Sequence, residues 1–138
     1  MKTEDKKQSV ILLWGPVILW YSIMFYLSHQ PNLNSGLAYD FLLRKCAHIF
    51  EFAVLSLLIF NAIWKSNYFK EKKDLRLSYS IMTVFIVSLS LAASDEIHQS
   101  FVRGRHGTYT DVMIDSIGIM LSCLVLKMRH LKSFNKIS

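Results

Sequence analysis

Ionisable and amide side chains gather in two short stretches of this 138-residue chain, and their types suit acid/base chemistry or anion binding. The first stretch, RKCAHIFE, covers residues 44–51. The second, ASDEIHQSFVRGRHGTYTDVMIDSIG, covers residues 93–118. Histidine beside carboxylates can transfer protons near neutral pH. Lysine and arginine can hold an anion such as phosphate, and arginine does so with two parallel hydrogen bonds.

Three roles can be assigned to these side chains from their chemistry. The acid/base set is His48, Glu51, Asp95 and Glu96, in which His48 would be poised by Glu51 or Asp95. The substrate- or anion-binding set is Lys45, Gln99, Arg103 and Arg105. The set that would shape the pocket is Gly104, Asp111, Asp115 and Gly118.

Four apolar segments must position these residues, in a chain that is 52% hydrophobic. They cover about residues 10–27, 46–64, 77–94 and 111–128. Each is close to the ~20 residues that a helix needs to cross a bilayer core about 30 Å thick. The sequence therefore predicts a single all-α membrane domain, residues 1–138, built as a four-helix transmembrane bundle.

The distribution of lysine and arginine predicts which loops are cytoplasmic. If both termini and the loop after the second segment are cytoplasmic, those regions hold twelve of the sixteen basic residues. The positive-inside rule therefore places both termini in the cytoplasm of a multi-pass protein of the cell membrane. Basic cytoplasmic loops also explain the formal net charge of +6, because they set the topology and attract anionic lipid headgroups. The charge therefore does not indicate a nucleic-acid-binding protein, and the sequence contains no nucleic-acid-binding motif.

This topology brings the polar stretches to the outer face of the membrane. Arg44, His48 and Glu51 fall at i, i+4 and i+7, as do Asp111, Asp115 and Gly118, so each set lies along one side of a helix. Charged side chains below the membrane surface should face the bundle and pair, because exposure to lipid costs several kcal/mol. We expect Arg105 or Arg103 to pair with Asp111 or Asp115, and Lys45 with Glu51 or Asp95. A polar pocket at the outer face follows.

The two stretches RKCAHIFEFAVLSLL and SDEIHQSFVRGRHGTYTDVMIDSIG resemble the VanZ-like membrane proteins, a family named for an accessory determinant of teicoplanin resistance. The resemblance extends over roughly residues 20 to 125. The family pattern maps here onto Lys45, His48, Glu51, Asp95, Glu96, Gln99, Phe101, Gly104, Arg105, Asp111 and Gly118. It implies a change at the cell surface that lowers susceptibility to lipophilic glycopeptides. The resemblance implies no established reaction and no established substrate.

Three positions depart from the family pattern. Asp115 stands where asparagine is common, Phe52 where a tyrosine often follows the glutamate, and Arg103 where proline or another residue is usual. Asp115 adds a carboxylate that could change which partner Arg105 selects.

Several functions agree with such a pocket. It could bind an anionic membrane lipid, a lipid-linked wall precursor or a glycopeptide. It could instead process a lipid headgroup or phosphate, with His48 as acid/base, although no recognised nucleophile and base pair is present. The polar residues could also only lock helix ends together through ion pairs. An ion- or proton-coupled transporter is a further alternative, which the apolar inner halves of the helices disfavour.

The sequence contains no recognised metal or cofactor signature, so we predict no cofactor. A divalent metal stays open as an alternative, because His48, Glu51, Asp95, Glu96 and His98 carry ligand atoms. Lys45 and Arg105 would compete as counter-charges for the same carboxylates. The sequence does not indicate an oligomeric state.

Overall fold

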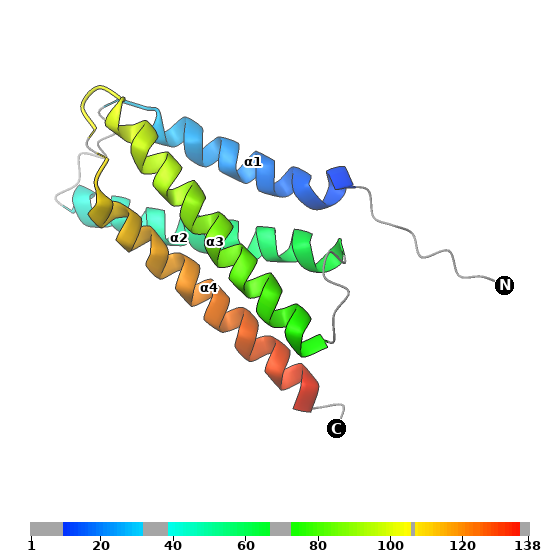
Figure 1. Ribbon diagram of the computed structural model, residues 1–138. Coiled ribbons are helices and arrows are strands. Elements are labelled where there is room, and N and C mark those ends of the chain that lie inside the picture. Colours follow the sequence, from blue (N-terminus) through cyan, green and yellow to red (C-terminus); the bar gives the residue numbers. More distant parts are fainter. Residues whose placement is uncertain (1–9, 32–38, 67–72, 106, 136–138) are drawn as a thin grey trace.

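The computed structural model describes residues 10–31, 39–66, 73–105 and 107–135, and within these ranges it contains helices and no strand. The helices are α1 (Val10–Ser28), α2 (Asp40–Lys65), α3 (Lys73–Ser100) and α4 (Tyr109–Asn135) (Figure 1). Each is long and apolar enough to cross a membrane. The predicted all-α bundle of four membrane-spanning helices is therefore confirmed.

The helices are longer than the apolar segments of the sequence. α2 begins at Asp40, ahead of the apolar run, and α3 continues through Asp95, Glu96 and Gln99 to Ser100. A helix satisfies its own backbone hydrogen bonds, so it can continue into polar sequence when neighbouring protein groups meet the side chains. The polar residues at the end of α3 are therefore held on a rigid element.

Burial follows the pattern of a membrane bundle. Large apolar side chains such as Ile11, Leu12 and Ile18 of α1 are largely exposed, as expected for a surface that meets lipid tails. Between the helices, Phe52, Leu55, Ile59, Val84 and Ile119 form a fully buried core. Polar residues are buried as well, including Ser56 and Ser88, whose hydroxyl oxygens lie 3.1 Å apart between α2 and α3.

α2 and α4 approach each other closely at Gly118. A Cβ atom on Gly118 would overlap the carbonyl oxygen of Ile49 and would lie 3.2 Å from the backbone nitrogen of Ala53. One turn further on, the Ser122 hydroxyl donates to the carbonyl of Ala53 at 2.8 Å. Small residues four positions apart let membrane helices approach in this way. The contact fixes α4 on α2 directly below the polar residues of both helices.

The four helices alternate in direction (Figure 1). α1 and α3 end where α2 and α4 begin, and we call this the pocket end of the bundle. Both polar stretches of the sequence lie there. α1 begins and α4 finishes toward the opposite end, so the described helices agree with termini on one side of the membrane. Which side that is, and whether the pocket end faces outward, stay predictions.

Candidate functional site

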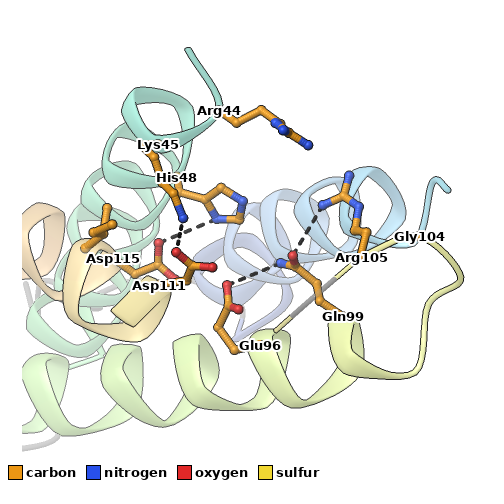
Figure 2. Close-up of a pocket in the computed structure, with 10 residues that line it drawn as sticks. Arg44, Lys45, His48, Glu96, Gln99, Gly104, Arg105, Asp111 and Asp115 are labelled. Carbon is orange, nitrogen blue, oxygen red and sulfur yellow. Dashed lines mark hydrogen bonds and ion pairs between the residues drawn. The ribbon is translucent and has the colours of Figure 1, made fainter. Parts of the chain in front are cut away.

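A pocket of about 270 Å³ lies at the pocket end of the bundle (Figure 2). It is formed by the first turns of α2 and α4, the last turns of α3 and the loop between α3 and α4. Its lining residues are Arg44, Lys45, His48, Glu96, Gln99, Gly104, Arg105, Asp111, Ile114 and Asp115. Eight of the twelve residues assigned to the site from the sequence thus line one cavity.

The other four assigned residues lie around it. Asp95 is buried beside the pocket, with 1% of its surface exposed, and Gly118 forms the helix contact below it. Glu51 is half-buried on α2, and its backbone carbonyl accepts a hydrogen bond from the Trp20 indole of α1 at 3.1 Å. Arg103 is exposed and is not a lining residue.

Two ion pairs connect α2 with α4 across the pocket. Lys45 pairs with Asp111, and Nδ1 of His48 lies 3.5 Å from Oδ1 of Asp115 (Figure 2). The sequence-based expectation that Lys45 pairs with Glu51 or Asp95 is therefore wrong. Lys45 pairs with a residue of α4 because α2 and α4 pack closely at Gly118, which places the first turns of the two helices side by side.

Asp95 holds α3 to α1. Its Oδ2 accepts hydrogen bonds from the Ser28 hydroxyl at 3.0 Å and from the Gln99 amide at 2.7 Å. All three side chains are buried. The end of α1 is therefore fixed to the same carboxylate that the sequence assigns to acid/base chemistry.

Glu96 holds the loop that precedes α4. Its Oε2 accepts a hydrogen bond from the backbone N–H of Thr108 at 3.1 Å. The loop also passes so close to α3 that a Cβ on Gly107 would overlap the Glu96 carbonyl oxygen. Gly104 adopts a φ of 81°, a backbone conformation that favours glycine. These two glycines make the tight turn that places the start of α4 against the pocket.

Arg105 fastens the loop to the end of α1. Its guanidinium donates to the carbonyls of Gln30 and Leu27, each at 3.1 Å, and to Oε1 of Gln99 at 3.3 Å. The last carbonyls of a helix lack partners within the helix and attract cations. Arg105 therefore bonds to backbone carbonyls in the last turn of α1 and just beyond it, and not to Asp111 or Asp115, so that predicted pairing is wrong.

The positive charge of Arg44 also affects the pKa of Arg105. Burial lowers the pKa of the Arg105 guanidinium, and the positive charge of Arg44 lowers it further, against the opposite effect of nearby carboxylates. A guanidinium stays protonated in proteins. Two cationic groups thus share the mouth of the pocket (Figure 2).

The site also offers atoms that could hold a metal ion. One ligand atom each from His48, Asp95 and Glu96 lies within 4.8 Å of the other two. Oδ1 of Asp95, both carboxylate oxygens of Asp115 and Nδ1 of His48 are buried without a hydrogen-bond partner.

Two residues of the site received no role from the sequence. The i, i+4, i+7 spacing puts Arg44 on the polar side of the second helix. Its position at the pocket mouth depends on how the loop between α3 and α4 folds, which this spacing does not predict. Ser28 lies in YLSHQPN, a segment that resembles the family's serine-rich exit from the first helix, and this was the available signal. Its contact with Asp95 spans 67 residues of sequence, which helix periodicity cannot predict.

Comparison with known proteins identifies the family of the chain. No curated protein and no solved structure was found to match the chain. A family model described as VanZ/LLP1 matches residues 13–130, which include all of α2 and α3, most of α1 and α4, and every residue that lines the pocket. The chain is therefore a multi-pass membrane protein that belongs to the VanZ/LLP1 family.

Proposed function

We propose that the pocket binds the phosphate-bearing headgroup of an anionic lipid or a lipid-linked cell-wall precursor at the outer face of the cytoplasmic membrane. Binding there lowers the susceptibility of the cell to glycopeptides such as teicoplanin. Both ligands present the same chemistry to the protein, a phosphate oxyanion at the membrane surface with its apolar chains in the bilayer.

The position of Arg44 and Arg105 is the observation that carries this proposal. Two guanidinium groups at one pocket mouth repel each other, as the effect of Arg44 on the Arg105 pKa indicates. An anion between them would remove this repulsion and accept charge-assisted hydrogen bonds from both. Arginine suits phosphate because its planar group presents two donors to two oxygens.

The rest of the pocket suits a headgroup in size and polarity. Its volume of about 270 Å³ is near the lower end of small-molecule sites, which begin at about 300 Å³. His48 and Gln99 add neutral donors or acceptors for a polar headgroup. A whole lipid does not fit in this volume, so its chains would remain in the surrounding bilayer.

A hydrolytic form of this function is favoured by the contact between His48 and Asp115. Nδ1 of His48 lies 3.5 Å from a carboxylate with 1% of its surface exposed. A carboxylate beside an imidazole fixes the orientation of the ring and stabilises its protonated form. His48 could then take a proton from a water molecule that attacks a phosphate ester. Release of a headgroup by the purified protein would support this second candidate.

Replacement of Arg44 by glutamine is expected to weaken binding of an anionic phospholipid by about tenfold. The substitution removes a charge-assisted interaction, and at an exposed position we expect the low end of its usual range, about 1.5 kcal/mol, which corresponds to about tenfold in affinity. Arg44 is exposed, and thermal unfolding of the variant, followed by circular dichroism, checks that the fold persists. The measurement is titration of the full-length protein, purified in detergent, with short-chain phosphatidylglycerol.

Arg129→Gln is the matched control, because Arg129 is also exposed but lies toward the far end of α4. It changes net charge equally and should leave affinity unchanged. Short-chain phosphatidylcholine, whose headgroup has no net charge, should bind more weakly to the unaltered protein. Equal affinity of both arginine variants would contradict the proposal.

A further inference from the structure

The polar cluster at the pocket end contains more negative than positive groups. Five carboxylates lie in it, those of Glu51, Asp95, Glu96, Asp111 and Asp115. Three cationic side chains, Arg44, Lys45 and Arg105, line the same pocket. Among the described residues of this cluster, carboxylates therefore outnumber cationic side chains.

Three of the ligand-bearing side chains already converge. One atom each from His48, Asp95 and Glu96 lies within 4.8 Å of the others. Around one ion with ligand distances of 2.0 to 2.2 Å, tetrahedral ligand atoms lie about 3.4 Å apart. Small side-chain rotations would close this difference. The residues come from α2 and from successive positions of α3, so both supports are rigid helices.

An unpartnered oxygen points to a missing ligand. Asp95 has 1% of its surface exposed, and its Oδ1 has no hydrogen-bond partner, although its Oδ2 accepts two. A buried carboxylate oxygen without a partner is costly. A cation bound by Oδ1 would satisfy that oxygen and leave the contacts of Oδ2 with Ser28 and Gln99 in place.

Asp115 supplies a supporting group for such a site. It is buried, and one of its oxygens lies 3.5 Å from Nδ1 of His48. A metal-binding histidine typically donates its other ring N–H to a carboxylate, which orients the ring and increases its basicity.

We propose that His48, Asp95 and Glu96 bind one divalent transition-metal ion, Zn²⁺ or Mn²⁺, beside the pocket. One imidazole and two carboxylates favour a first-row transition ion over Mg²⁺ or Ca²⁺, which prefer oxygen ligands alone. Three protein ligands leave a coordination position open for a ligand in the pocket.

The charge of the ion would support the proposed function, which is binding of a phosphate-bearing headgroup. A divalent cation would add positive charge to a cluster rich in carboxylates, and its open position would take a phosphate oxygen held by the two arginines. This consequence rests on the proposed function, but binding of the ion itself does not. His48 would then be a metal ligand, which removes it from the acid/base role considered above.

The test is metal binding by the full-length protein purified in detergent and stripped with a chelator. Equilibrium dialysis with elemental analysis should give one Zn²⁺ or Mn²⁺ per chain, with much weaker uptake of Mg²⁺ and Ca²⁺. Asp95→Asn keeps the shape of the side chain but removes its charge, and should weaken binding by about 100-fold. Glu96→Gln should do the same if Asp95→Asn does not fold.

His98→Gln is the control for adventitious binding, because a ring nitrogen of His98 lies 3.2 Å from one of His29 at the same end of the bundle. It should leave affinity unchanged. X-ray absorption of the loaded, unaltered protein should give one imidazole in the first shell. Two imidazoles, loss of binding in His98→Gln alone, or no stoichiometric binding would overturn the metal site.

Phosphatidylglycerol titrations with and without the metal separate the two proposals. Lipid binding without any metal uptake would reject the metal site and keep the proposed function. Metal uptake that leaves the protein unable to bind anionic lipid would keep the site and reject the function.

Discussion

Gly118→Ala is expected to destabilise the bundle more than any other single-methyl change in the described helices. The added Cβ would overlap the Ile49 carbonyl oxygen and crowd the backbone nitrogen of Ala53, so α2 and α4 must separate. Backbone atoms cannot rotate away as a side chain can. We expect a cost of about 3 kcal/mol or more, at the upper end of the range for overpacked cores. Thermal unfolding of the purified protein, followed by circular dichroism, measures it.

Gly15→Ala is the matched control, because a Cβ on Gly15 of α1 has no atom within 4 Å. The same substitution there should be neutral or slightly stabilising, since alanine favours helix by up to about 1 kcal/mol over glycine. Similar melting temperatures for the two variants would mean that α2 and α4 do not approach as described.

Arg105→Ala is expected to release the loop before α4 from the end of α1 and to loosen that end, which then keeps the Ser28–Asp95 hydrogen bond to α3. The substitution removes donors to the carbonyls of Leu27 and Gln30 and to Oε1 of Gln99. Hydrogen bonds to a charged group contribute about 1.5 to 3 kcal/mol each. Because Arg105 is partly exposed, we expect a total loss of about 2 to 4 kcal/mol. Hydrogen exchange followed by mass spectrometry should show faster exchange in the peptide that ends α1.

Arg103→Ala tests whether charge alone explains that effect. Arg103 is exposed two residues away, and its loss should change stability by no more than about 0.5 kcal/mol. If Arg103→Ala increases exchange at the end of α1 as much as Arg105→Ala does, the described contacts of Arg105 are not what holds this helix.

The membrane helices could be predicted from the sequence because their apolar segments are long and carry few charges. The polar side of α2 could also be predicted, since Lys45 and His48 lie three residues apart and both line the pocket. Local periodicity and segment length can be read from one stretch of sequence, without knowing which helices pack against it.

The choice of partners could not be predicted in the same way. Lys45 had several carboxylates within plausible reach, and its selection of Asp111 depends on the distance between α2 and α4. Arg105 bonds to backbone carbonyls, and every residue carries one, so the sequence holds no signal for this contact. The link between Ser28 and Asp95 depends on where α1 lies against α3.

The site therefore combines functional and structural demands on the same residues. Asp95, Glu96 and Arg105 each hold a neighbouring element in place, so variants at these positions would lose activity through the fold as well as through chemistry. Arg44 is a better probe because it is exposed at the pocket mouth. Its substitution tests ligand binding, and thermal unfolding of the same variant tests whether the bundle still assembles.

The most direct test of the central claim is teicoplanin susceptibility of cells that express the unaltered protein, Arg44→Gln or Arg129→Gln at equal membrane abundance. Lipids and wall precursors should be profiled in the same cultures. We predict that the unaltered protein and Arg129→Gln lower susceptibility, and that Arg44→Gln does not, with a parallel change in one phosphate-bearing species. Equal protection by all three proteins, or no protection by any of them, would contradict the proposal that this pocket acts on an anionic headgroup to protect the cell.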